Sequence, residues 1–373
     1  MKKMIFMAIA ALFATMMLST NTIAQEGKSA LTARQVIDSI DSSKWKVNPL
    51  DYGMTAMQYQ MAEAAIFAKG MQSRTSINQF YHFPGLSKAS DTWVVTPNND
   101  TIYSIAVVDA RKGFSVTLPE VGDRFISLQV HDQYHTFVDY NWTTGTHTYN
   151  GDQIDTDYVF VGIRIATTAT TEDIKYITEI LQPQIIIKSN SAIPFKTNVK
   201  EEDIKKLRKA LLVEWSNLDN MYDTVAFDIH DVSDWERWTY TIAGSWGLSP
   251  ESTAMYASWA PKDTKGNQCY QATFDKVPAK AFASLTVYND KNYLMSDDYN
   301  VVSTTRPNFK SSKDGKFTII FGGMDCKSIA DKMGVNFAYT PNDGWKAQLR
   351  SYRPDVEAMK HYVLPEIKTI SSK

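Results

Sequence analysis

The stretch that decides the fold is Thr96-Pro97-Asn98-Asn99-Asp100-Thr101-Ile102-Tyr103, which places turn-forming residues directly before an apolar run at 102–108. Pro97 has a fixed backbone dihedral and favours an extended conformation for Thr96 before it. The side chains of Asn98, Asn99 and Asp100 can bond nearby backbone groups, which braces turns. The stretch therefore predicts a tight, side-chain-braced entry into a buried strand.

Around this entry the residue pattern has the two-residue period of β-strands. We expect strands at 101–109, 115–118, 125–131, 136–142 and 158–164, with a short buried strand at 185–187. A second series is expected at 269–274, 282–288, 317–322 and 345–352. Gly, Pro and Asn-Gly or Asp-Gly pairs separate these runs, which is typical of close-set antiparallel strands.

Helical periodicity precedes and separates the two strand series. It predicts helices at 32–42, 50–72, 171–182, 201–218 and 234–243, a further one opening at Pro250, and a short one after Asp355. The order predicts an α+β fold in which a helical middle segment separates two mainly antiparallel β-rich portions, sandwich or jelly-roll-like. The expected divisions are 25–165 (helix pair plus β-rich domain), 166–260 (helical segment) and 261–373 (β-rich domain with a terminal helix).

Residues 1–24 have the pattern of a cleaved signal peptide. Lys2 and Lys3 precede an uncharged apolar run at 4–18, and Thr22-Ile23-Ala24 offers small residues for cleavage before Gln25. The alternative is an uncleaved anchor, but the run is shorter than the ~20 residues of a membrane span. We therefore expect a periplasmic or secreted protein with no stable membrane insertion after cleavage.

The charge balance argues against a nucleic-acid partner. The sequence has 39 basic and 41 acidic side chains, and residues 1–24 hold two of the basic ones, which leaves 37 against 41 and a net charge of −4. A basic patch is the usual electrostatic signature of nucleic-acid binding. The two cysteines, Cys269 and Cys326, either form a disulfide after export or remain separate buried thiols.

Two sets of motifs resemble known families. Residues 96–103 are similar to the Thr-Pro-Asn-Asn-Asp-Thr-Leu-Tyr motif of domain of unknown function 1254, and residues 124–134 resemble the strand that follows it there. Ser284-Leu285-Thr286-Val287-Tyr288, Asp314-Gly315 and the run at 349–354 resemble domain of unknown function 1214. The resemblance covers most of the chain after residue 24. It implies a two-part, β-rich exported bacterial protein and implies no reaction.

The entry motif offers the first candidate site. Asn98, Asn99, Asp100 and Tyr103 would lie together at a strand mouth, where they could hold a ligand hydroxyl or carboxyl. The alternative interpretation is structural: the same side chains satisfy buried backbone groups of a braced turn.

The second candidate is the run at 131–135. Along an extended strand Asp132 and Tyr134 share one face, while His131 and His135 share the other. The two histidine Cβ atoms would then lie about 13 Å apart, too far for one metal ion unless a turn intervenes. We therefore predict a polar site at Asp132 and Tyr134 and no metal site.

The third candidate lies on the last long strand, where Arg350 and Tyr352 share a face. An arginine at such a position can grip a carboxylate with two parallel hydrogen bonds. That carboxylate belongs either to a ligand or to Asp100 or Asp132, in which case the pair joins the two β-rich portions.

The sequence contains no nucleophile elbow, no His-Glu-x-x-His motif and no phosphate-binding loop, and it implies no cofactor. Its 17 Phe, 19 Tyr and 9 Trp suggest an aromatic-lined pocket. Three hypotheses follow. The first is an exported protein that binds a small polar or glycan-like ligand between the β-rich portions. The second is a hydrolase or lyase with Asp100 or Asp132 as general base. The third is a structural subunit of a homo-oligomer.

Overall fold

The computed structural model describes residues 31–91, 96–266 and 268–370, so the expected signal peptide lies outside the described residues. The chain forms two units, Met1–Ser39 and Ile40–Lys373. The described part of the first unit holds α1 (Ala33–Asp38), which begins at a capping box of Thr32 and Gln35. All elements named below belong to the second unit.

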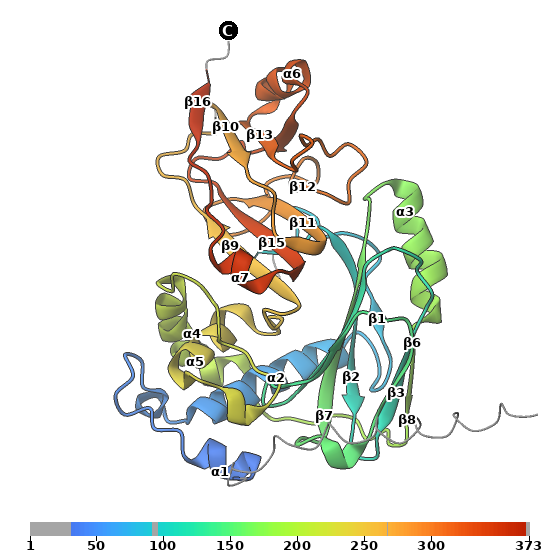
Figure 1. Ribbon diagram of the computed structural model, residues 1–373. Coiled ribbons are helices and arrows are strands. Elements are labelled where there is room, and N and C mark those ends of the chain that lie inside the picture. The colour runs from blue at the N-terminus through green and yellow to red at the C-terminus, as the bar shows by residue number, and fades with distance from the viewer. Residues whose placement is uncertain (1–30, 92–95, 267, 371–373) are drawn as a thin grey trace, which may run out of the picture. The chain divides into compact units, whose positions relative to one another are not determined.

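The first half of the second unit is a sandwich of two antiparallel sheets (Figure 1). The larger sheet has the order β1 (Tyr81–His82), β2 (Thr101–Asp109), β7 (Tyr158–Ala166), β4 (Ile126–Asp132) and β5 (Phe137–Asn141). The smaller has the order β6 (Gly145–Tyr149), β3 (Phe114–Leu118) and β8 (Ile186–Ser189). Alternate residues of β2, β3, β4 and β7 form one buried apolar cluster, because side chains of a strand point to the two faces in turn.

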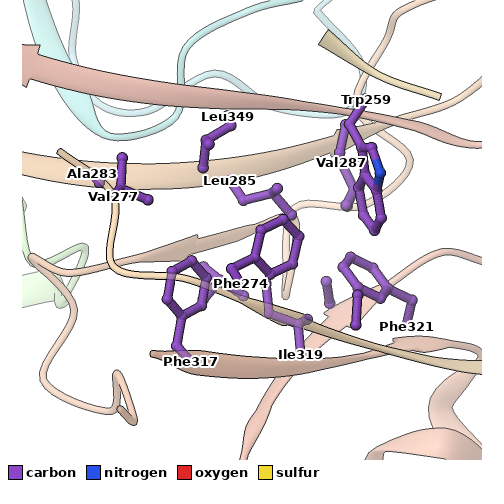
Figure 2. Packing of buried hydrophobic residues seen from close by; sticks show 14 of the residues in the cluster. Trp259, Phe274, Val277, Ala283, Leu285, Val287, Phe317, Ile319, Phe321 and Leu349 are labelled. Carbon is purple, nitrogen blue, oxygen red and sulfur yellow. The ribbon is translucent and has the colours of Figure 1, made fainter. Parts of the chain in front are cut away.

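The second half is another sandwich. One sheet has the order β12 (Val301–Ser303), β11 (Ala279–Tyr288), β15 (Lys346–Pro354) and β9 (Ala254–Trp259). The other has β14 (Asn336–Tyr339), β13 (Phe317–Gly322), β10 (Cys269–Phe274) and β16 (Lys368–Ile370), with β13 and β14 parallel. Figure 2 shows Phe274, Ile319 and Phe321 facing Leu285 and Leu349 across the core.

Three helices pack beside the larger first sheet. α2 (Ala56–Gln72), α4 (Glu201–Ser216) and α5 (Trp235–Ser245) contact one another, and α2 places Ala64, Ala68 and Met71 against β2 and β7. The remaining helices are η1 (Pro49–Tyr52), η2 (Gly151–Gln153), α3 (Thr171–Lys175) with its continuations η3 (Tyr176–Leu181) and η4 (Gln182–Gln184), η5 (Ile229–Asp231), α6 (Met324–Met333) and α7 (Val356–Lys360). None of the helices within the described ranges is long and apolar enough to cross a membrane.

The predicted α+β fold with two β-rich portions is confirmed, and the strands at 101–109, 269–274 and 317–322 have the predicted bounds. The helix expected at 50–72 is two helices, because Gly53 (φ 83°) ends η1 and Thr55 caps α2. The helix expected at Pro250 is wrong: a turn closes onto the Pro250 carbonyl and β9 follows. The strand predicted at 185–187 is the edge strand β8, which is largely exposed rather than buried.

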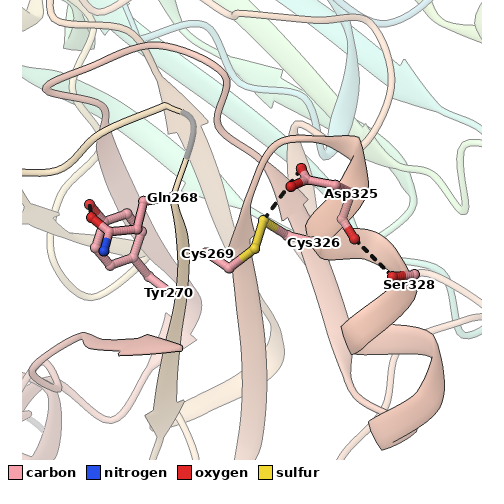
Figure 3. The surroundings of a disulfide bond; sticks show 6 residues. All are labelled: Gln268, Cys269, Tyr270, Asp325, Cys326 and Ser328. Carbon is pink, nitrogen blue, oxygen red and sulfur yellow. Dashed lines mark hydrogen bonds between the residues drawn. A yellow bond between two sulfur atoms is a disulfide. The ribbon is translucent and has the colours of Figure 1, made fainter. Parts of the chain in front are cut away.

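The structure settles the state of the cysteines. Cys269 on β10 and Cys326 on α6 form a disulfide with their Cα atoms 5.5 Å apart, and the bond closes a loop of 57 residues in sequence (Figure 3). Both residues are buried beside Ile320 and Ala330. The bond therefore fixes α6 to the second sheet of the C-terminal sandwich.

Replacing both cysteines, Cys269→Ser with Cys326→Ser, should lower the free energy of unfolding by about 2–4 kcal/mol, because a loop of this length becomes free in the unfolded chain. Urea unfolding monitored by tryptophan fluorescence measures the change. A reducing agent should shift the wild-type midpoint downward and leave the double variant unaffected. A double variant as stable as the wild type would show that the bond contributes nothing.

Candidate functional site

A cavity of about 1180 Å³ lies between the outer faces of the two sandwiches, that is, the sheet faces that do not build the sandwich cores. The N-terminal sheet supplies one wall through Tyr103 and Ile105 of β2, Gln129 and His131 of β4, and Phe160, Gly162 and Arg164 of β7. Of the residues between them in sequence, Val130, Val161 and Ile163 belong to the sandwich core, and Ser104 is a buried polar residue. The two-residue period of the strands therefore separates core residues from cavity residues.

The C-terminal sandwich supplies the opposite wall by the same rule. Tyr256 of β9, Tyr288 of β11, and Gln348 and Arg350 of β15 face the cavity, while their neighbours Met255, Val287 and Leu349 are core. Residues of α4, α5 and the loops after them, including Trp215 and Trp246, close the side between the sheets. The cavity is thus built by segments that are far apart in the sequence.

One end of the cavity is apolar. The Trp246 ring lies 4.4 Å from the ring of Phe67, 5.1 Å from that of Phe160 and 4.9 Å from that of His131, measured between ring centres. Burial lowers the pKa of His131 to about 4, so its imidazole is neutral at pH 7. We refer to Phe67, His131, Phe160 and Trp246 as the aromatic end.

The opposite end is polar and contains two arginines. Arg164 donates to the Ser249 hydroxyl at 2.9 Å and to the Gln129 side-chain oxygen at 3.3 Å. Its guanidinium lies 5.6 Å from the centre of the Tyr103 ring, within the range of a cation–π interaction. These contacts hold the Arg164 side chain in the wall of the cavity.

Arg350 also faces the cavity but is almost fully buried, at 3 % exposure. It donates to Thr286 Oγ1 at 2.9 Å, to the Thr96 carbonyl at 2.9 Å and to the Tyr288 hydroxyl at 2.8 Å. Among the described residues, no carboxylate lies within 4.0 Å of this guanidinium or of that of Arg164. Arg350 therefore joins the two sandwiches through neutral acceptors rather than through a direct ion pair.

The Thr96–Asp100 motif forms the main polar part of the joint between the sandwiches. The Pro97 carbonyl accepts from the Tyr288 hydroxyl at 2.8 Å, and the Asn98 amide donates to the Tyr352 hydroxyl. The motif's other contacts to the C-terminal half are those of Thr96 with Asn292 and Arg350, Asn99 with Asn300 and Arg306, and Asp100 with Ser284. Each of the five motif residues thus bonds the C-terminal half, so the turn positions both walls of the cavity.

The backbone of the motif differs from the sequence expectation. Thr96 has φ 47°, in the left-handed region, whereas Pro97 favours an extended residue before it. A β-branched residue is strained at a positive φ. Here the Thr96 N–H donates to the Asn292 carbonyl at 2.8 Å while its own carbonyl accepts from Arg350. These bonds to the C-terminal half hold the strained conformation.

Asp100 is fully buried in this joint and does not line the cavity. Burial raises the pKa of its carboxyl, while nearby Arg350 and the bond from Ser284 act in the opposite direction. Its Oδ1 atom has no hydrogen-bond partner among the described residues. Asn99 and Tyr352 are also buried in the joint and do not line the cavity.

The residues at 131–135 do not form a continuous strand, so the 13 Å separation expected for the two histidines is wrong. β4 ends at Asp132, a turn follows in which His135 has φ 62°, and the rings of His131 and His135 are 5.2 Å apart. The His135 Nε2 atom accepts from the Gly247 N–H at 2.7 Å. The Asp132 carboxylate accepts from the backbone N–H groups of Tyr134 and Thr136 at 2.9 and 3.0 Å. Asp132 and Tyr134 thus belong to this turn and do not line the cavity.

The structure divides the eight residues named from the sequence into three groups. Asn98, Tyr103 and Arg350 line the cavity. Asn99, Asp100 and Tyr352 lie in the joint beside it, and Asp132 and Tyr134 lie in the turn after β4. The predicted site residues therefore do not form one cluster.

Sequence reasoning missed Arg164, Gly162 and Tyr256. Arg164 stands between Ile163 and Ile165 inside an apolar strand, and such a charge on one face of a buried strand is a signal that could have been used. Gly162 is a glycine in the middle of the same strand, which marks a close approach of a ligand or another backbone. Tyr256 was missed because its strand was expected to be part of a helix.

Metal ligands gather at one place in the described residues, where Cys269, Cys326 and Asp325 offer ligand atoms within 4.8 Å of one another. The two sulfurs are bonded to each other, so they are not available as thiolates. This cluster is therefore a disulfide with a neighbouring carboxylate and not a metal site.

These features define a protein of two β-sandwiches with a cavity between their outer sheet faces. Two family models match it, both described as "Protein of unknown function": DUF1254 at residues 77–162 and DUF1214 at residues 254–356. The chain combines these two domains, in the order that its motifs indicate. The first match ends at Gly162 within β7, so Arg164 lies just outside it, and the second match covers the sheet that contains Arg350.

Two solved structures are similar to this chain. The VPA0106 protein from Vibrio parahaemolyticus is 19% identical with a TM-score of 0.64, over 85% of this chain and 98% of that one. A putative uncharacterized protein from Burkholderia cenocepacia is 13% identical with a TM-score of 0.47, over 91% of this chain and 94% of that one. At this identity the first likeness supports the fold alone. No curated protein matches the sequence.

Arg350→Met should lower the free energy of unfolding by about 3 kcal/mol, because the Thr96 carbonyl and Tyr288 hydroxyl lose a charged donor and buried Asp100 loses its nearby positive charge. The matched control is Lys346→Met on the same face of β15, which should change stability by less than about 0.5 kcal/mol. Urea unfolding measures both. Equal stability of the two variants would contradict the role of Arg350 in the joint.

Asp132→Asn should alter the pH dependence of stability. Burial raises the pKa of Asp132 to about 7 in the folded protein, above its ordinary value of 3.8. The stabilisation that the protonated carboxyl gives the folded protein is therefore complete below about pH 4. As the pH rises to 7, the free energy of unfolding of the wild type falls by no more than about 1.4 kcal/mol per pH unit. The melting temperature of the variant relative to the wild type should rise between pH 4 and 7. A constant difference over this range would contradict the raised pKa.

Proposed function

We propose that this protein is exported and binds a small polar ligand in the cavity between its two sandwiches. The observation that carries the proposal is the floor of the cavity at Gly162. This glycine lies on the central strand β7, paired with Ile105 and Gln129, and both of these residues also face the cavity. The nearest atom to a Cβ built there is the Cβ of Gln129, at 3.9 Å. A side chain would fit at this position, and the cavity is open above it.

The character of the lining supports a ligand rather than a further packing partner. Binding sites for small molecules are concave and largely aromatic, with a few polar groups that fix orientation, in cavities of about 300–1,000 Å³. The aromatic end provides the apolar part. Asn98, Tyr103 and Arg350, together with Arg164 and Tyr256, provide the polar part, and we propose these five as ligand-binding residues.

Export is supported by the signal-like segment at 1–24 and by the disulfide between Cys269 and Cys326. Disulfides form in the periplasm and outside the cell, and are rare in reducing cytoplasm. We propose a periplasmic or secreted location on these two observations.

The alternative functions have less support. A hydrolase or lyase with Asp100 or Asp132 as general base needs the carboxyl within hydrogen-bond reach of the substrate. Both carboxyls are buried outside the cavity lining, and their hydrogen bonds serve the joint and the turn after β4. A purely structural subunit has no need of an open cavity with arginines in its walls.

The proposal is tested by filling the cavity. Gly162→Leu should project its side chain over the floor and abolish stabilisation by any ligand of the wild type, while Gly162→Ala should retain most of it. Both variants should unfold within about 1 kcal/mol of the wild type, because the strand accommodates a Cβ there. A thermal-shift screen with sugars, organic acids and their neutral analogues measures binding, since a ligand of the native state raises the melting temperature.

A ligand that stabilises the wild type and Gly162→Ala but not Gly162→Leu would support the cavity as the site. Equal stabilisation of all three would place binding elsewhere. No stabilisation of the wild type by any compound in the panel would count against a ligand-binding function.

A further inference from the structure

The cavity has a charge opposite to that of the chain. Among the described residues, five basic ones line it (Arg74, Lys88, Arg164, Lys346 and Arg350) against two acidic ones (Asp91 and Asp219), whereas the whole sequence has a net charge of −2. His131 is neutral at pH 7 because burial lowers its pKa. A concave surface lined with charges of one sign and low-dielectric walls concentrates ligands of the opposite sign.

Arg164 is the residue that is best placed to use this field. It lies on β7, two residues from the cavity floor at Gly162, and faces the cavity between the floor and the opposite sheet. Its hydrogen-bond partners, Ser249 and Gln129, are neutral, and no carboxylate among the described residues forms an ion pair with it. A partly buried guanidinium with only neutral partners is electrostatically uncompensated, which is unfavourable unless an anion joins it.

Arg350 adds a second positive charge to the polar end of the cavity, but its hydrogen bonds are made within the joint. Its hydrogen bonds reach Thr286, Tyr288 and the Thr96 carbonyl. Asp100, a buried carboxyl that interacts electrostatically with Arg350, accepts from the Ser284 hydroxyl in the joint and is not part of the cavity lining. Arg350 therefore contributes positive potential, while Arg164 offers donors for direct contact.

We propose that the ligand is a small organic acid whose carboxylate binds Arg164 beside Arg350, and whose ring lies over Gly162 against the aromatic end. This inference rests on the proposed function and names its ligand class. Guanidinium groups match carboxylates with two parallel hydrogen bonds, which gives both affinity and orientation. Aromatic side chains such as Phe160 and Trp246 pack against the apolar face of either a sugar ring or an aromatic ring.

Matched pairs of compounds isolate the carboxylate. The probes are galacturonate against galactose for a sugar ring, and phenylacetate against phenylacetamide for an aromatic ring. In each pair the ring is kept and the negative charge is removed. At least one acid should raise the melting temperature of the wild type in a concentration-dependent manner, and its neutral partner should not. The pair whose acid raises the melting temperature shows whether the ligand has a sugar ring or an aromatic ring.

Arg164→Met removes the guanidinium and retains an apolar stem of similar length. It should weaken binding of the acid roughly 10- to 100-fold, as expected for the loss of hydrogen bonds to a charged group. Without added acid this variant should melt at or above the wild-type temperature, because Gln129 Oε1 keeps its bond from Ser249 and an uncompensated charge is gone. The control is Lys332→Gln on exposed α6, which removes one positive charge away from the cavity and should bind the acid like the wild type.

Stabilisation of the wild type by the neutral member of a pair as strongly as by the acid would overturn the inference and leave the proposed function standing. An Arg164→Met variant that binds the acid like the wild type would overturn it as well. If neither acids nor neutral compounds stabilise the wild type, both the inference and the proposed function fail.

Discussion

Hydrogen bonds from the Thr96–Asp100 motif to the C-terminal sandwich hold two sheet faces opposite each other, and the cavity depends on that spacing. Both faces are the outer sides of sandwiches whose apolar residues already pack inward. Two such faces would ordinarily either separate in water or collapse onto each other. Here the turn occupies the contact at one edge and Arg350 bonds the Thr96 carbonyl, while residues of α4 and α5 close the side, so the two faces are held with the cavity between them.

The joint also explains why its residues are polar although they are buried. The backbone carbonyls of Thr96 and Pro97 have no strand partner and are satisfied by Arg350 and Tyr288 instead. The strained backbone of Thr96 follows from the same constraint, since its N–H and carbonyl bond two different segments of the C-terminal half. Strain of this kind persists only where surrounding contacts determine the conformation. The motif therefore supports the cavity, and Tyr103, the last residue of the 96–103 stretch, lines the cavity wall.

The sequence was sufficient for the fold class and for several strands because apolar alternation and turn residues are local signals. Strand β2 is one example, where the motif ends and the period of two begins. Local signals were insufficient where pairing decides the outcome. β9 has no clear alternation, and it is a strand because β15 bonds along its length. The turn after β4 was also not predictable from local signals. Its sequence predicts an extended strand, but His135 has φ 62° and the chain turns there. For the site, the motif indicated Asn98 and Tyr103, and the last long strand indicated Arg350. Only the packing of two distant sheets brings Arg164 and Tyr256 to the same cavity.

The most direct measurement is a crystal structure of the protein with the acid that raises its melting temperature most. The account predicts that the acid lies in the cavity, with its carboxylate within hydrogen-bond distance of the Arg164 guanidinium and its ring between Gly162 and Trp246. An acid bound outside the cavity, or in the cavity with its carboxylate directed away from both Arg164 and Arg350, would contradict the account.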